Sequence, residues 1–268
     1  HGQRHSLMRS VIATLKLMAF FVLSLFVVPL QYLLLCFHKG DKAYIIPKIW
    51  HKGVCAIFRI KVSVRGAPGS GKQTLYVSNH LSYLDIPAIA TILKASFVAK
   101  KDVAKWPVFG FLSKLQQTAF IDRSRGAAAK EAGALQTMLT EGKSLIIFPE
   151  GTSTDGQNVL PFKSSLFSLA LNDAATSLDI QPFTIQVKEV NGKAPTTQEL
   201  RDIYAWHREM DTELPQHLWL FAKSKGVKIT LTFHPVTNAS EYKDRKTLAK
   251  YCHEAVSNGV EHHEALAA

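Results

Sequence analysis

The stretch Asn-His-Leu-Ser-Tyr-Leu-Asp, residues 79–85, decides how the fold is interpreted. The apolar run before it, residues 75–77, is typical of a buried strand, and residues 86–93 predict a helix after it. Five residues of regular helix turn through about 500°, so His80 and Asp85 would not share one helix face. We therefore expect His80 in the turn and Asp85 in the first helical turn. There the carboxylate accepts a hydrogen bond from one ring nitrogen, and the other ring nitrogen serves as a base.

A capped helix is the simpler interpretation of the same stretch. In that case Asn79 or Ser82 caps the helix, Asp85 interacts favourably with the helix dipole, and His80 is an incidental turn residue. The rest of the chain decides between the two, because a reactive histidine needs ligand-binding groups nearby and a cap needs none.

The composition narrows the class of protein. The chain has 268 residues, 47% of them hydrophobic and 20% charged, which excludes a disordered protein and allows a large core. A formal charge of +11 indicates an anionic partner. The sequence carries no nucleic-acid-binding motif, so we expect a membrane surface or a phosphorylated substrate and no nucleic acid. The three cysteines form no CxxC pair and no metal-ligand spacing, which suits a reducing compartment.

The N-terminal region is the most apolar part of the chain. Residues 17–37 form a run of 21 residues that would span about 31 Å as a helix, enough to enter a bilayer. No small-residue cleavage site follows, so we expect the segment to be retained. Residues 44–58 have the spacing of an interfacial helix with a basic rim, or of a surface helix packed on the core. The sequence predicts membrane-associated helices over residues 1–58 and an α/β domain over residues 59–268. A buried core helix is the alternative for residues 17–37.

Strands and helices alternate through the second region, which predicts an α/β fold with a mixed, largely parallel sheet flanked by helices. The expected strands are residues 61–65, 74–77, 97–99, 118–121, 144–148, 180–187 and 227–233, and the expected helices include residues 86–93, 124–140 and 244–257.

A glycine-rich stretch, residues 66–73, nearly matches a nucleotide-binding P-loop. Gln73 stands where that loop needs serine or threonine for Mg²⁺, and a strand-like sequence follows where it needs a helix. We expect a turn between two strands. ATP turnover would support the alternative, a P-loop nucleotide-binding protein.

Polar residues also follow two other predicted strands. Arg123 comes after residues 118–121 and suits bidentate binding of phosphate, or a surface ion pair with a neighbouring acidic residue. Residues 150–153, Glu-Gly-Thr-Ser, come after residues 144–148 and expose amides and hydroxyls suited to an anion, or form a plain turn. In open α/β sheets ligands bind outside the carboxyl ends of strands, so we expect these groups near His80. No Gly-x-Ser-x-Gly frame is present, and a His–Asp pair without an enzyme nucleophile suits activation of a substrate hydroxyl.

Taken in order, these motifs resemble those of the glycerolipid acyltransferases, especially the bacterial 1-acylglycerol-3-phosphate acyltransferases. Residues 79–85 are similar to the first motif of the family, residues 120–123 to the second and residues 148–153 to the third. Residues 97–102 resemble a lysine-bearing segment of these enzymes, with Asp102 where the family usually has glutamate. Residues 180–183, with Pro182, resemble a weaker motif on the acyl-donor side whose first valines are replaced here. The resemblance covers residues 61–187.

The resemblance implies a mechanism. His80 would deprotonate the sn-2 hydroxyl of 1-acyl-sn-glycerol-3-phosphate while Asp85 holds its tautomer, and the alkoxide would attack an acyl thioester of coenzyme A or acyl carrier protein. No metal, other cofactor or covalent intermediate is needed. Arg123 and Lys100 would hold the phosphate, and Glu150 and Gly151 would position the glycerol. The substrate-binding residues implied are Asn79, Lys100, Arg123, Glu150, Gly151, Thr152 and Ser153.

Two other functions stay open at this point. A lyso-ornithine lipid offers a hydroxyl without a phosphate, and the motifs do not separate it from the glycerophosphate acceptor. A catalytically silent membrane-surface protein is the other alternative, against which the intact His80 and Asp85 argue. The acyltransferase interpretation places the protein at the membrane, on the cytoplasmic face of the inner membrane. Residues 204–219 lie outside the shared motifs and are a candidate region for acceptor choice, but the sequence does not indicate how they would act.

Overall fold

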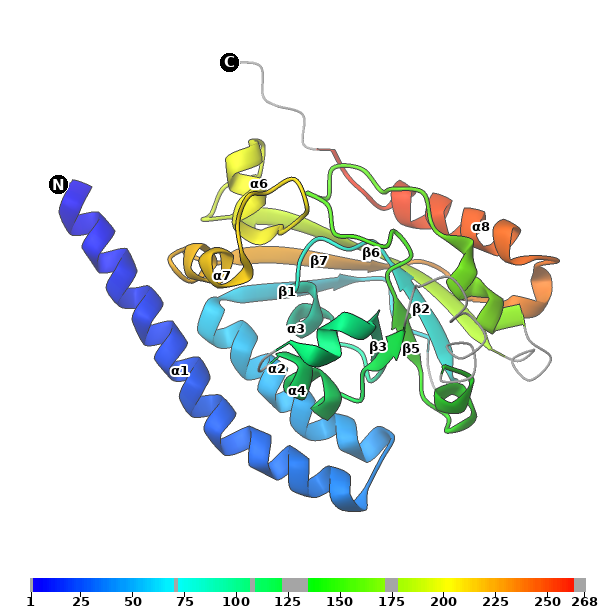
Figure 1. Ribbon diagram of the computed structural model, residues 1–268. Coiled ribbons are helices and arrows are strands. Elements are labelled where there is room, and N and C mark those ends of the chain that lie inside the picture. The colour runs from blue at the N-terminus through cyan, green and yellow to red at the C-terminus, as the bar shows by residue number, and fades with distance from the viewer. Residues whose placement is uncertain (1, 70–71, 107–108, 122–134, 172–177, 263–268) are drawn as a thin grey trace.

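The computed structural model describes residues 2–69, 72–106, 109–121, 135–171 and 178–262. Its centre is one sheet with the strand order β1-β7-β6-β2-β5-β3-β4, with β8 paired to β6 (Figure 1). The strands are β1 Ile60–Arg65, β2 Thr74–Ser78, β3 Ser96–Lys100, β4 Ala119–Ile121, β5 Leu145–Ile147, β6 Asp179–Val190, β7 Val227–Phe233 and β8 Thr237–Asn238.

The sheet is mixed and largely parallel, as predicted. β2 pairs in parallel with β5 and β6, β3 with β4 and β5, and β1 with β7, while β6 runs antiparallel to β7 and β8. Because β2 and β5 are parallel neighbours, the chain leaves both strands at the same edge of the sheet. The motifs at residues 79–85 and 150–153 therefore begin side by side.

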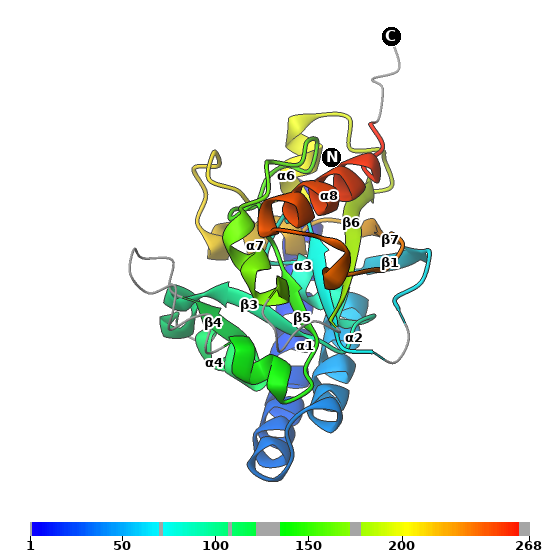
Figure 2. The ribbon, with the colours of Figure 1, turned by 90° about the vertical axis from the view of Figure 1, so that its right-hand side faces the viewer.

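Side-chain alternation divides the core between the two faces of the sheet. Tyr76 and Ile146 face one apolar cluster, which includes residues of α2 and α7. Leu75 and Ile147 face the other cluster, which includes residues of α8. Figures 1 and 2 show α8 and the pair α1–α2 on opposite sides of the sheet. Apolar runs such as Leu145–Ile147 are thus buried on both faces, as the sequence indicated.

The helices that surround the sheet are short apart from three. They are α1 Gly2–Phe37, α2 Ile45–Phe58, α3 Asp85–Ala90, α4 Phe109–Leu115, α6 Gln198–Tyr204, α7 Leu214–Ala222 and α8 Arg245–Asn258, with 3₁₀ segments at Asp41–Tyr44, Lys101–Lys105, Ser164–Leu171 and Ala239–Glu241. Residues 135–140 are also helical. The first part of the helix predicted there, residues 124–134, lies outside the described residues.

α1 and α2 form an N-terminal hairpin that runs past the sheet (Figure 1). α1 begins at Gly2, well before residue 17, because residues 2–16 contain no helix breaker that would stop it. Only Ala13, Lys16 and Gln31 are buried along it, so the alternative of a buried core helix is wrong. Within the described residues, α1 is the one helix long and apolar enough to cross a membrane. Its exposed large apolar side chains are Leu7, Met8, Val11, Ile12, Leu15, Met18, Phe21, Val22, Leu25, Phe26, Leu30, Tyr32, Leu33 and Phe37.

Most other sequence predictions are confirmed within a few residues. α3 ends at Ala90, earlier than residue 93, and β6 continues to Val190, beyond residue 187. The glycine-rich stretch connects β1 directly to β2. In the described residues that follow, 72–78, the chain enters β2 without forming the helix that a P-loop needs.

Candidate active site

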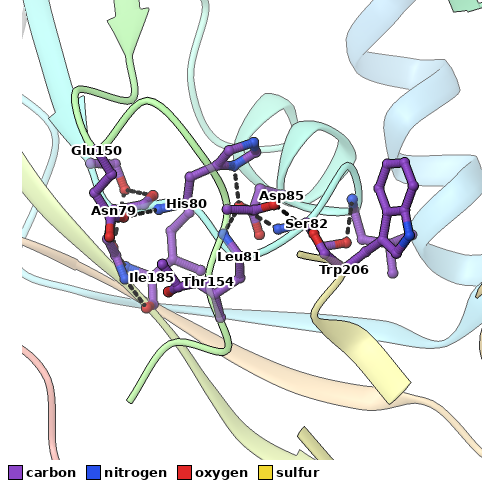
Figure 3. A network of polar contacts seen from close by, with 12 residues as sticks. Asn79, His80, Leu81, Ser82, Asp85, Glu150, Thr154, Ile185 and Trp206 are labelled. Carbon is purple, nitrogen blue, oxygen red and sulfur yellow. Dashed lines mark hydrogen bonds and ion pairs between the residues drawn. The ribbon is translucent and has the colours of Figure 1, made fainter. Parts of the chain in front are cut away.

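His80 and Asp85 are in contact at the connection between the end of β2 and the start of α3. Nδ1 of His80 lies 2.7 Å from Oδ2 of Asp85, the first residue of α3 (Figure 3). The Asp85 side chain is fully buried, whereas that of His80 is 23% exposed. A carboxylate oxygen only accepts hydrogen bonds, so Nδ1 carries the proton and Nε2 presents a lone pair. No described residue bonds Nε2, which leaves it available to a substrate hydroxyl.

Four donors converge on the Asp85 carboxylate. Oδ2 accepts from His80 and from the backbone amides of Leu81, at 2.7 Å, and Ser82, at 3.2 Å. Oδ1 accepts from the Tyr204 hydroxyl at 2.7 Å. The carboxylate is thus held in one orientation, which fixes the tautomer and direction of the His80 ring. The N-cap residue of α3 is Leu84, and its side chain makes no capping bond. The Ser82 hydroxyl accepts from the Leu84 amide at 3.0 Å in the turn that leads into the helix, whereas the Asn79 amide bonds Ile185, so Asn79 does not cap α3.

Glu150 holds His80 from the other side. Its Oε1 accepts from the His80 backbone amide at 2.8 Å, and its Oε2 accepts from that of Leu160 at 2.9 Å (Figure 3). The side chain is buried, and this burial raises the pKa of Glu150 to about 7. The amide of Thr154 donates to the His80 carbonyl at 3.0 Å. Both backbone polar atoms of His80 are therefore tied to residues 150–154. Contact between Glu150 and substrate stays a prediction.

Asn79 ties the end of β2 to β6. Its Oδ1 accepts from the amide of Ile185 at 2.8 Å and its Nδ2 donates to the carbonyl of the same residue at 3.0 Å. The side chain is buried, and these bonds fix the residue that precedes His80. Asn79 thus positions the base through the backbone, and its predicted contact with substrate stays a prediction.

The turn after β5 needs its glycine. Gly151 has φ = 78°, in the left-handed region, and its amide donates to the Phe148 carbonyl at 3.1 Å. The Ser153 hydroxyl donates to the carbonyl of Trp206 at 2.5 Å, and Thr152 donates weakly to the Ser153 carbonyl at 3.4 Å. In this structure the Ser153 proton serves to anchor the turn. Binding of substrate by these three residues stays a prediction.

Of the two predicted phosphate-binding residues, Lys100 is described by the structure. Lys100 is the exposed last residue of β3 and pairs in register with Ile121, the last residue of β4. Arg123 lies outside the described residues, so its predicted role stays a prediction.

Pro182 lies in β6, opposite Val77 of β2 and between the stretches that pair with β7 and β8. A proline fits there because the position lies outside both of those ladders.

Three aromatic residues complete the site: Phe148, which begins the third motif, and Tyr204 and Trp206, to which no motif pointed. The Phe148 ring stacks on the His80 ring with centroids 4.3 Å apart. Tyr204 is fully buried, and burial raises its pKa well above the usual range, so it remains a hydrogen-bond donor. The Trp206 amide donates to the Leu81 carbonyl at 3.0 Å. Tyr204 is 119 residues from Asp85, so no local spacing could have revealed their contact.

A buried histidine supports the same turn from further out. Nε2 of His217 lies 2.9 Å from the Asp202 carbonyl, which only accepts, so this nitrogen carries the proton. Nδ1 is then the acceptor, and the Tyr83 hydroxyl donates to it at 2.9 Å. Burial lowers the pKa of His217, which favours this neutral form. Tyr83 lies within the 79–85 stretch, so α6 and α7 hold that stretch at two points.

Comparisons with known proteins agree with this geometry. A family model described as Acyltransferase matches residues 59–186. The lyso-ornithine lipid O-acyltransferase of Brucella abortus is 33% identical over 237 residues, which are 87% of this chain and 87% of that protein. The 1-acyl-sn-glycerol-3-phosphate acyltransferase of Neisseria meningitidis is 32% identical over 207 residues, 76% of each chain.

A solved structure shares the fold. The crystal structure of the 1-acyl-sn-glycerophosphate acyltransferase PlsC from Thermotoga maritima superimposes with a TM-score of 0.66 and 20% sequence identity, over 97% of this chain and 96% of that one. The motifs, the His80–Asp85 pair and these relatives together assign the protein: the chain belongs to the acyltransferase family.

Proposed function

We propose that this enzyme transfers an acyl chain from a thioester to the free hydroxyl of a lysolipid, with His80 as the general base. One observation carries the proposal: Nδ1 of His80 is bonded to a buried carboxylate, while no described residue bonds Nε2 on the partly exposed side. A base held in one tautomer beside an open position is what activation of a hydroxyl requires.

The reaction balances with these groups alone. Nε2 of His80 takes the hydroxyl proton as the oxygen attacks the thioester carbonyl, and a C–O bond forms. The C–S bond then breaks and the thiolate leaves. The imidazolium gives the proton to this thiolate, which becomes a thiol, and His80 returns to its neutral form. Asp85 stabilises the imidazolium through the 2.7 Å bond to Nδ1. General-base assistance of this kind accelerates a reaction by about 10²- to 10⁴-fold.

Two acceptors are supported by different observations. The Brucella abortus relative named a lyso-ornithine lipid O-acyltransferase aligns with 87% of the chain, more than the 76% aligned with the Neisseria meningitidis enzyme. 1-Acyl-sn-glycerol-3-phosphate is supported by Lys100 at the end of β3 and Arg123 shortly after β4, both suited to a phosphate. The proposed donor is acyl-CoA or acyl carrier protein, and the proposed location is the cytoplasmic face of the inner membrane, with α1 in contact with lipid.

The test offers both lysolipids to the full-length protein in bilayer vesicles, each with a labelled acyl-CoA and a labelled acyl carrier protein. We expect transfer to at least one acceptor, and loss of that transfer in His80→Ala. His262→Ala is the matched control, because His262 is exposed and lies outside the site. Near-normal turnover by folded His80→Ala would refute the mechanism. Absence of transfer to both acceptors by the wild-type protein would refute the lysolipid assignment.

A further inference from the structure

A cavity lies away from the His80 site. It has a volume of about 1030 Å³ and is formed by the first half of α1, by α6 and by the end of α7. In Figure 1, α6 and α7 lie on one side of the N-terminal half of α1. The residues that line it include none of those placed in the active site, so it is not an extension of that site.

The walls of this cavity carry uncompensated positive charge. Six lysine and arginine side chains line it against a single carboxylate, Glu199; they are Arg9, Lys16, Arg59, Lys193, Lys223 and Lys225. Among the described residues, no carboxylate lies within ion-pair distance of any of the six. Lys16 is buried and its ammonium donates to one backbone carbonyl, that of Ser224, at 2.9 Å. Several cations held together without counter-charges favour an anion between them.

The same walls carry apolar side chains that water would otherwise cover. Met8 and Ile12 of α1 and Leu220 of α7 line the cavity and are 55%, 43% and 39% exposed. A small soluble anion would leave them wet, whereas an amphiphilic anion would cover them. The exposed apolar side chains of α1 also continue from this cavity along the helix. An anionic lipid fits both features, because its headgroup meets the cations and its chains meet the helix.

We propose that this cavity, the α1 headgroup cleft, binds the phosphate-bearing headgroup of an anionic phospholipid whose acyl chains lie along the exposed face of α1. Bound lipid would link α1 to α6 and α7 and fix the depth at which the protein sits in the bilayer. This inference does not rest on the proposed acceptor, because binding is measured without turnover.

The experiment measures binding to the full-length protein in uncharged detergent by calorimetry. The probes are dihexanoyl-phosphatidylglycerol, the zwitterionic dihexanoyl-phosphatidylcholine with the same chains, and inorganic phosphate. The variant Lys193→Gln/Lys225→Gln removes two exposed cations of the cleft, and Lys243→Gln/Lys246→Gln removes two exposed cations near the start of α8. Near a surface each such charge contributes enough to change binding severalfold, so we expect the cleft variant to weaken phosphatidylglycerol binding by about 10- to 30-fold. The α8 variant should change it less than about threefold.

A second variant, Met8→Ser/Ile12→Ser, tests the lipid part of the inference. It should weaken phosphatidylglycerol binding and leave that of inorganic phosphate unchanged. Phosphate that binds as tightly as phosphatidylglycerol would overturn the proposal in favour of a soluble phosphate compound. Equal binding of the two lipids, or equal losses in both lysine variants, would overturn it as well. A cleft variant that keeps its lipid affinity but loses turnover with acyl carrier protein would also overturn the proposal, because the cleft would then bind that donor protein.

Discussion

The Tyr204→Phe variant removes one hydroxyl group from the interior of the active site. That hydroxyl donates to Oδ1 of Asp85 at 2.7 Å, and both side chains are fully buried. A hydrogen bond to a charged group contributes about 1.5–3 kcal/mol, and no water replaces it at a buried atom. We expect the free energy of unfolding to fall by about this amount. Oδ2 keeps its three donors, so the bond to His80 persists.

The variant should also change the pH dependence of catalysis. Asp85 without the Tyr204 donor directs more of its negative charge at the His80 imidazolium, which is thereby stabilised. The acid limb of the kcat/KM profile should therefore move to higher pH. The variant also loses one of the bonds that orient the Asp85 carboxylate and, through it, the His80 ring. If this loss of orientation outweighed the stabilised imidazolium and cost the transition state the whole of the lost bond, kcat/KM would fall by roughly 10- to 150-fold, so we expect a loss within this limit.

Tyr44→Phe is the matched control for this measurement. Tyr44 is also a buried tyrosine, and its hydroxyl bonds to Ser96, outside the active site. It should lose stability without a shift of the pH profile. Chemical denaturation and pH–rate profiles of the two variants distinguish the effects. The proposed role of Tyr204 is refuted if both variants show the same profile as the wild-type protein.

Three further predictions concern the residues around the base. Asp85→Asn should lower kcat by up to about 10⁴-fold because the amide favours the wrong His80 tautomer. Steady-state kinetics of the folded variant measure this, and a loss below tenfold would contradict it. Burial raises the pKa of Glu150 from 4.5 to about 7, so the folded state holds a proton that the unfolded chain releases, and stability should fall as the pH rises between these values. Glu150→Gln should flatten this dependence in urea titrations between pH 4.5 and 8, and an unchanged slope would show that another group is responsible. Arg123→Ala should lower kcat/KM for 1-acyl-sn-glycerol-3-phosphate by an amount equivalent to about 1.5–3 kcal/mol of transition-state stabilisation, and should lower that for lyso-ornithine lipid far less. Equal losses for both acceptors would mean that Arg123 does not bind phosphate.

Local patterns in the sequence predicted the strands and the central pair of the site. The apolar runs at β2 and β5 and the helical spacing of α8 are set by burial, which leaves a periodic trace in the chain. The contact of His80 with Asp85 spans five residues, so turn geometry was enough to predict it.

Contacts between distant segments were not predictable in this way. The Tyr204 and Ser153 bonds join segments 119 and 53 residues away from their partners, and they depend on how α6 packs after the sheet has formed. Asn79 was expected to cap α3, yet its amide completes the pairing of β2 with β6. That outcome follows from the strand order, which a single sequence does not contain.

The dependence of the 79–85 turn on residues 204–217 has a consequence for the order of events during synthesis. Among the described elements α1 leaves the ribosome before all others, and more than 150 residues separate its end from Tyr204. A nascent chain that has emerged only as far as β6 already contains His80 and Asp85, but it lacks the Tyr204, Trp206 and His217 contacts that hold their turn. The parallel neighbour of β1, β7, is also still missing at that stage. If α1 contacts lipid as proposed, the growing polypeptide reaches the lipid surface long before its 79–85 turn is locked.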